Sequence, residues 1–273
     1  MRNAAGFIER SSEMDEQSWW DLWNGSFRTE DDRDETSTEL FNHVNGIYRE
    51  LTVGRRRRVF EVACGTGTLS RRLNFTSYHG LDLSATAIGI AHQKAASLAL
   101  PADVDAPIYE AADFHDWPLP SEPFDVVLCV DAISCFRDQP LVLRRMAQTV
   151  RQGGYILITT VNPFVYNRIR RPDGGRLQNG PVSHWLTRRE LLALIRQAGL
   201  KVERSYTIMP RGNCGILRFV NSGRLDRALG RRGSAAFRRF KERAGLGQYR
   251  VIVARKTNEV RTDPTPSSRT TSL

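Results

Sequence analysis

The chain alternates short apolar runs with longer segments in which apolar residues recur every three or four positions. The short runs are rich in Val, Ile, Leu and aromatic residues, and they predict buried strands near residues 59–63, 77–81, 107–113, 124–132 and 155–161. Helical spacing predicts helices over 84–98 and 140–150, the second stopped by Gly153 and Gly154. Strands that alternate with helices in this way predict an α/β fold, a doubly wound parallel sheet covered on both faces.

The N-terminal residues add helices to this predicted core. Trp19, Trp23 and Phe27 are spaced so that they share one face of a helix. A second helix, 38–51, is amphipathic. We treat residues 1–53 as a helical segment that precedes the main domain.

The C-terminal residues extend the predicted sheet. Thr187, with Glu190 three residues later, is typical of a helix start. Two further strands, at 201–209 and 248–255, give seven in all. An insertion of about residues 215–247 separates them and carries a basic helix around 235–243. The main domain is predicted to span residues 54–256. The polar tail, 257–273, is predicted to be disordered.

The segment RVFEVACGTGTLSRR combines a strand, a glycine turn and the expected start of a helix at Leu69. Gly65 and Gly67 permit backbone angles that other residues avoid, and they let a ligand approach the main chain. The N-terminus of the expected helix would offer unpaired N–H groups to that ligand. Glu61 lies inside an apolar strand and needs a partner there, and Asp82 ends the next strand. This pattern predicts a ligand at the carboxyl ends of the strands, with a dinucleotide as the alternative.

The sequences EVACGTG and GLDLS resemble the class I S-adenosylmethionine-dependent methyltransferases, especially their small-molecule branch. The resemblance covers roughly residues 58–161. It implies a Rossmann-like, seven-stranded sheet that is mostly parallel with an antiparallel last strand. It also implies S-adenosylmethionine as cofactor and N-terminal helices that lie over the cofactor as a lid.

In the resembled family, residues at the strand ends hold the cofactor. The resemblance assigns its methionine end to Glu61, Ala63, Gly65 and Gly67. It assigns the ribose hydroxyls to Asp82 and the adenine to Leu83, Asp113 and Phe114. It places Val130 and Asp131 beside the sulfonium.

Charge is unevenly distributed along the chain, which has a formal net charge of +10. Residues 1–50 contain five arginines and twelve acidic residues, a net of −7. Residues 224–256 contain eleven basic and two acidic residues, a net of +9. Such asymmetry is compatible with an acidic ligand, a nucleic acid or an anionic membrane surface. The alternative is a solvated basic face that the acidic N-terminal segment neutralises.

Other features limit where the protein acts and what it binds. No apolar run approaches the roughly 18–20 residues of a membrane span, and no secretory signal is visible. The four cysteines follow neither zinc-site nor disulfide spacing. We therefore expect a cytoplasmic protein with reduced thiols and no metal site. The sequence does not indicate its oligomeric state.

Methyl transfer from a sulfonium needs alignment and a dry site, and a general base only when the acceptor must lose a proton. The base candidates are His184, in the loop after the fifth strand, and Asp131, with His43 and Tyr166 as more distant alternatives. No Tyr is followed by Lys four residues later, as a short-chain dehydrogenase requires, and no Pro-Pro-aromatic clamp follows the fourth strand. We therefore expect methylation of an oxygen or nitrogen of a small-molecule acceptor. The alternative is a nucleic-acid-associated protein that uses the basic insertion.

Overall fold

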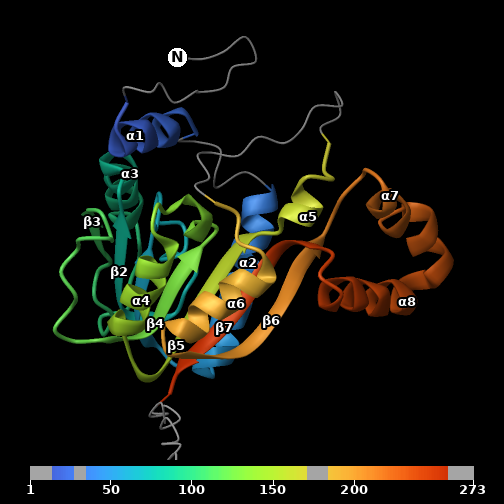
Figure 1. Cartoon of the computed structure of the whole chain (residues 1–273). Helices are drawn as coiled ribbons and strands as arrows, with labels where there is room; N and C mark the ends of the chain where they lie inside the picture. The colour runs from blue at the N-terminus through green and yellow to red at the C-terminus, as the bar shows by residue number, and fades with distance from the viewer. Residues whose placement is uncertain (1–13, 28–34, 171–183, 258–273) are drawn as a thin grey trace, which may run out of the picture.

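The computed structural model describes residues 14–27, 35–170 and 184–257. These residues form a seven-stranded sheet. Figure 1 shows helices on both of its faces. The strands lie in the order β3-β2-β1-β4-β5-β7-β6. Strand β7 is antiparallel to both of its neighbours, and the other adjacent pairs are parallel. The predicted doubly wound sheet with an antiparallel last strand is confirmed. Its strands are β1 (Arg57–Val62), β2 (Phe75–Asp82), β3 (Ile108–Ala111), β4 (Phe124–Val130), β5 (Val150–Val161), β6 (Leu200–Pro210) and β7 (Gly247–Lys256).

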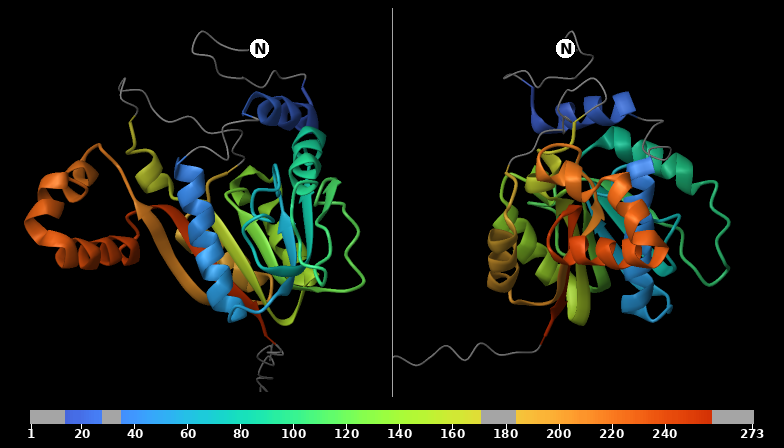
Figure 2. Two further views of the ribbon diagram at one scale, coloured as in Figure 1. Left: turned by 180° about the vertical axis from the view of Figure 1, so that it is seen from behind. Right: turned by 90° about the vertical axis from the view of Figure 1, so that its right-hand side faces the viewer.

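Helices cover the two faces of the sheet in separate layers, as the two views of Figure 2 also show. One apolar core packs α2 and α3 against the sheet, and the other packs α4 and α6. Helix α1 lies against α3 at the top of Figure 1. The helices on the layers and at the edge are α1 (Glu16–Phe27), α2 (Glu35–Thr52), α3 (Ala85–Ala95), α4 (Gln139–Thr149), α5 (Pro163–Tyr166) and α6 (Arg188–Gln197). The predicted capping box at the start of α6 is present.

The helix expected from Leu69 is absent. Residues 65–72 form a series of turns instead, and β2 begins at Phe75. The Ser70 hydroxyl donates to the Gly67 carbonyl at 2.9 Å, and the Leu73 N–H donates to the Leu69 carbonyl at 3.1 Å. Since β2 begins only six residues after Leu69, the segment is too short for a helix to propagate.

The boundary between α4 and β5 also differs from the prediction. Helix α4 ends at Thr149, and β5 begins at Val150, so Gly153 and Gly154 lie inside the strand. A Cβ on Gly154 would lie 2.7 Å from the Asp125 carbonyl oxygen. This glycine is therefore used for close packing against β4 rather than to stop a helix.

The insertion between β6 and β7 folds as α7 (Ile216–Val220) and α8 (Gly223–Arg243), with a kink at Gly230. We call residues 211–246 the arm. It extends from the edge of the sheet in Figure 1. No helix within the described ranges is long and apolar enough to cross a bilayer. The predicted tail lies, apart from Thr257, outside the described residues.

Candidate functional site

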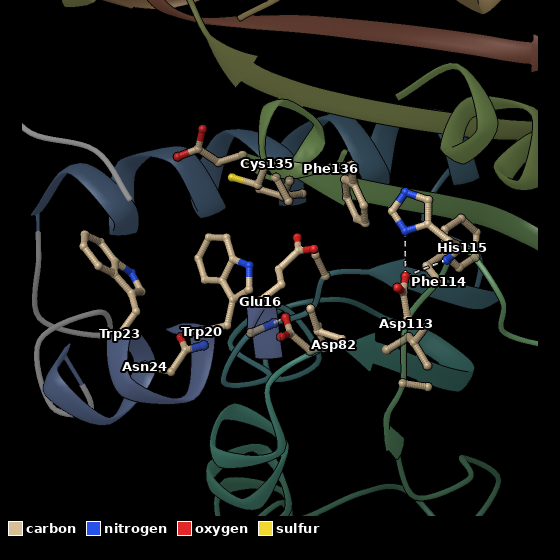
Figure 3. Close-up of a pocket in the computed structure, with 18 residues that line it drawn as sticks. Glu16, Trp20, Trp23, Asn24, Asp82, Asp113, Phe114, His115, Cys135 and Phe136 are labelled. Atoms are coloured by element: carbon tan, nitrogen blue, oxygen red, sulfur yellow. Dashed lines mark hydrogen bonds and ion pairs between the residues drawn. The ribbon is translucent and has the colours of Figure 1, made fainter. Parts of the chain in front are cut away.

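A cavity opens at the carboxyl ends of β1, β2 and β4, beneath α1 (Figure 3). Its volume is about 200 Å³. The fold brings eight of the predicted site residues to its wall: Ala63, Gly65, Asp82, Leu83, Asp113, Phe114, Val130 and Asp131.

Asp82 is held in place by the main chain around it. Its Oδ2 accepts the Gly65 N–H at 2.8 Å, and its Oδ1 accepts the Ser84 N–H at 2.9 Å. Gly65 has φ +52°, which turns this N–H toward β2. Burial raises the pKa of Asp82, although the two N–H donors oppose the shift. A carboxylate offers about four acceptor positions, so acceptor capacity remains for a ligand in the cavity that Asp82 lines.

Asp113 belongs to a network that the sequence analysis missed. Its Oδ1 accepts both the backbone N–H of His115 at 2.8 Å and the ring Nδ1 of His115 at 2.6 Å. Its Oδ2 accepts from Arg137 at 2.7 Å. Burial alone would raise the pKa of Asp113, but these bonds outweigh it and lower the pKa. Because the Asp138 N–H donates to His115 Nε2 at 3.4 Å, we assign the ring proton to Nδ1.

Helix α1 forms the wall opposite Asp113 and His115. Glu16, Trp20, Trp23 and Asn24 line the cavity from this side, as Figure 3 shows. Trp19 is buried and stacks on Trp23, with ring centroids 5.1 Å apart. Of the predicted aromatic stripe, Trp19 is buried while Trp23 lines the cavity, and the side chain of Phe27 lies outside the described residues. Trp20, which is not part of that stripe, also lines the cavity.

Two polar contacts attach α1 to the strand ends. Asp21 Oδ1 accepts the Ser84 hydroxyl at 2.7 Å and the Thr86 N–H at 2.8 Å, so it caps the start of α3. Arg137 lies 3.4 Å from Glu16 while it also bonds Asp113. Helix α1 is therefore connected to Asp113 through Arg137 and to the residues that follow Asp82 through Asp21.

Asp131 follows β4 at the base of the cavity. Its φ of +55° is unusual for a residue other than glycine. The backbone holds this conformation because the Asp131 N–H donates to Thr159, at 3.0 Å to both its carbonyl and its hydroxyl oxygen. Removal from bulk water raises the pKa of Asp131 to about 7, and a hydrogen bond from Tyr249 of β7 opposes the shift.

Three predicted site residues lie outside the cavity wall. Glu61 is buried and bonds the Tyr78 hydroxyl, and burial raises its pKa to about 8. Gly67 faces Tyr109, whose hydroxyl would lie 2.8 Å from a Cβ at this position. The side chain of His184 is 62% exposed, with Nε2 4.0 Å from a carboxylate oxygen of Glu190.

The comparisons with known proteins agree with this geometry. The profile of a family described as a methyltransferase domain matches residues 38–205. The chain belongs to the S-adenosylmethionine-dependent methyltransferases. S-adenosylmethionine is accordingly the cofactor of this methyltransferase.

The methyltransferase is similar to two relatives of known name, and it shares its fold with a solved structure. It is 30% identical over 197 residues to phthiotriol/phenolphthiotriol dimycocerosates methyltransferase 1 of Mycobacterium ulcerans (strain Agy99), covering 70% of this chain and 67% of the relative. It is 24% identical to the ubiquinone biosynthesis O-methyltransferase of Shewanella sp. (strain ANA-3), covering 75% and 86% respectively. Magnesium protoporphyrin IX methyltransferase from Synechocystis PCC 6803 with bound S-adenosylmethionine shares the fold, with a TM-score of 0.57 at 12% identity over 91% of this chain and 100% of that chain.

Three residues around the cavity of this methyltransferase were not predicted, and a local sequence pattern could have indicated only one of them. His115 follows Asp113 by two residues, a spacing that allows a local hydrogen bond. Asp21 and Tyr249 reach the site from distant parts of the chain, so no local pattern identifies them.

Within the described ranges, no three His, Cys, Asp or Glu side chains lie close enough to hold a metal ion.

Proposed function

We propose that this methyltransferase transfers a methyl group to an oxygen or nitrogen of a small-molecule acceptor by in-line displacement, and that Asp131 receives the acceptor's proton. The observation that carries the proposal is the Asp131 carboxyl group at the base of the cavity, with a pKa of about 7. A carboxyl group that is half ionised near neutral pH suits proton removal from a hydroxyl or amine.

The donor groups of the cavity fit S-adenosylmethionine. The remaining acceptor positions on the two oxygens of Asp82 match the two hydroxyls of a ribose. Oδ2 of Asp113 accepts one bond, from Arg137, and retains a position for one N–H of the adenine amino group. Leu83, Phe114 and the backbone of Gly65 supply the adjoining walls.

We propose smaller roles for Glu61 and Gly67 than the resemblance implied. Glu61 supports the glycine turn from behind through Tyr78, because its carboxyl group is directed into the sheet and not into the cavity. Gly67 allows the turn to pack against Ala91 and Tyr109. Both residues would shape the methionine end of the site without touching the cofactor.

When bound, S-adenosylmethionine supplies a methyl group that its sulfonium already activates. The chain's own residues then align the acceptor and exclude water. The Asp131 carboxylate takes the proton from the attacking hydroxyl or amine, and later releases it to solvent. Tyr249 donates to the carboxylate, which orients it and limits the rise in its pKa.

Asp131 is favoured over His184 as the base by position. Asp131 lines the cavity, whereas His184 does not and its side chain is largely exposed. The Trp20, Trp23 and Phe136 side chains form apolar walls of the cavity that Asp131 also lines, which suits a small acceptor with a substantial apolar part. The relative named an O-methyltransferase supports an oxygen acceptor as the first choice.

The test is a screen of phenols, alcohols and amines with S-adenosylmethionine that carries a deuterated methyl group, read by mass. We expect label on an oxygen or nitrogen of a small molecule, with loss of transfer in Asp131→Asn and retention in His184→Gln. Label that appears only on RNA, or equal rates in the two variants, would contradict the proposal.

A further inference from the structure

The arm carries a large excess of positive charge. Residues 211–246 include ten basic and two acidic residues, a net of +8. Arg211 and Arg238 bond Glu39 of α2, at 2.9 and 3.0 Å, and so attach the arm to the body of the protein. Six exposed arginines on α7 and α8 pair with no carboxylate among the residues that the structure describes: Arg218, Arg224, Arg231, Arg232, Arg239 and Arg243.

Large apolar side chains are exposed beside these arginines. The exposed fractions are 75% for Phe219, 65% for Ile216, 61% for Phe240 and 40% for Leu229. Leu217 is fully buried and holds α7 in place, so the exposed set is not needed for internal packing. An exposed apolar set on a cationic helical segment indicates an interaction surface.

The contacts of Lys241 show that the two helices of the arm pack against each other. This lysine is buried, and its Nζ donates to Asn221 Oδ1 at 3.1 Å. The same Nζ lies 5.1 Å from the centre of the Phe237 ring, which stacks on Phe240. These contacts join α7 to α8 and leave Phe240 facing outward.

The arm leaves and re-enters the sheet at the edge that holds the cavity. Strand β6 runs parallel to β5, because both are antiparallel to β7. Its end at Pro210 and the start of β7 at Gly247 therefore lie at the carboxyl edge. Phe164 of α5, at the same edge, is also 43% exposed, with Arg168 over its ring at 4.0 Å. Figure 1 shows α5 and α7 on this side of the molecule.

We propose that the arm docks the protein on the surface of an anionic phospholipid bilayer. Arginines attract anionic headgroups, while the exposed Phe219, Ile216 and Phe240 enter the boundary between headgroups and acyl chains. A nucleic acid would also attract the arginines, but the aliphatic Ile216 and Leu229 side chains have no face for base stacking. The mixed aliphatic and aromatic set therefore favours lipid. This inference does not depend on the proposed acceptor or base.

The test measures sedimentation of the full chain with vesicles of phosphatidylcholine, with and without phosphatidylglycerol. One variant combines Phe219→Ser with Phe240→Ser, and a second combines Arg231→Gln with Arg232→Gln. Matched controls away from the arm are Leu119→Ser and Arg189→Gln, both at exposed positions. Thermal stabilisation by S-adenosylhomocysteine shows that each variant is folded.

We expect binding that requires phosphatidylglycerol and weakens with salt. Removal of the two phenylalanines should weaken it at least roughly tenfold at low salt, because apolar burial is lost. The arginine variant should also bind less, and both controls should bind like the wild type. Absence of wild-type binding to phosphatidylglycerol vesicles would overturn the proposal. Unchanged vesicle binding by the phenylalanine variant would also overturn it, because charge alone would then explain the surface. Loss of RNA binding in the arginine variant would strengthen that contrary conclusion.

Discussion

The backbone N–H of Gly65 donates to Oδ2 of Asp82 at 2.8 Å, which connects the glycine turn after β1 to the acid that ends β2. The bond fixes the carboxylate before any ligand arrives. The bond also couples the glycine turn to Asp82, so that neither moves without breaking it. The free energy of ligand binding is then not spent on ordering these two parts of the cavity wall.

Alanine substitutions should separate the roles of the two turn glycines. Both have positive φ, so each Ala costs about 1–2 kcal/mol in backbone strain. A Cβ at Gly67 would also lie 2.8 Å from the Tyr109 hydroxyl and 2.9 Å from Ala91 Cβ, whereas one at Gly65 meets no atom within 4 Å. We expect Gly67→Ala to lower the free energy of unfolding more, and Gly65→Ala to weaken S-adenosylhomocysteine binding more. Urea unfolding and calorimetric titration measure the two effects, and the reverse order would contradict these roles.

Asp82→Asn should weaken S-adenosylhomocysteine binding by about 1.5–3 kcal/mol, roughly 10- to 150-fold in Kd, because a charged acceptor is lost. Asp82→Ala should remove detectable binding. Asp116→Asn, at an exposed position beyond the cavity wall, is the matched control. Calorimetric titration measures all three, and an unchanged Kd for Asp82→Ala would refute the assignment.

The order and type of the elements could be predicted because they depend on local patterns. The apolar run of β4 and the spacing along α2 each indicate their structure without knowledge of any neighbour. The errors fell where tertiary packing overrides such patterns. Gly154 reads as a helix stop, but it is required by the close approach of β4. The short turn after Gly67 left no room for the expected helix.

Residues of the candidate site could be predicted only where their position at the end of a recognisable strand was sufficient to identify them. Asp82 and Asp113 each follow a recognisable strand, and both line the cavity. The groups that shift the pKa values of Asp82 and Asp131 do not follow from sequence, because Asp21 and Tyr249 respectively lie in elements more than 60 residues away. His184 appeared suitable from its loop, yet its side chain is largely exposed and lies outside the cavity wall. The lid and domain bounds and the cytoplasmic location stay predictions.

Asp21→Ala should loosen α1 over the cavity. The substitution removes the acceptor for the Ser84 hydroxyl and the Thr86 N–H, a loss typically worth about 1 kcal/mol. We expect S-adenosylhomocysteine to dissociate several-fold faster, because Trp20 and Trp23 would no longer be held over it. Stopped-flow tryptophan fluorescence measures the rate. Gln17→Ala, exposed on the same helix, is the control. Equal dissociation rates in the two variants would show that α1 does not retain the cofactor.

The proposed base predicts a pH dependence for methyl transfer. Because Asp131 must be ionised to accept a proton, kcat should rise with pH through about 7, its pKa. Tyr249→Phe removes a hydrogen bond that lowers this pKa, so the rise should move to higher pH while transfer at high pH persists. Tyr155→Phe, at the start of the β5–β7 pairing, should leave the profile unchanged. A Tyr249→Phe profile that shifts to lower pH, or does not shift, would exclude this arrangement.

The same carboxyl group predicts a trade between activity and stability. The pKa of Asp131 is higher in the folded chain, about 7, than its ordinary value of 3.8, so the folded state binds the extra proton between these values. The free energy of unfolding should therefore fall by about 1.4 kcal/mol per pH unit as the pH rises across that range, and stay low above it.

The variant Asp131→Asn tests this dependence, because Asn cannot ionise and tolerates the positive φ at this position. Asp131→Asn should be inactive yet more stable than wild type at pH 8, and the difference should shrink by about 2.5 kcal/mol at pH 5. Urea unfolding at both pH values measures the difference, and a variant less stable at pH 8 would mean that the charged carboxylate is not strained in the fold.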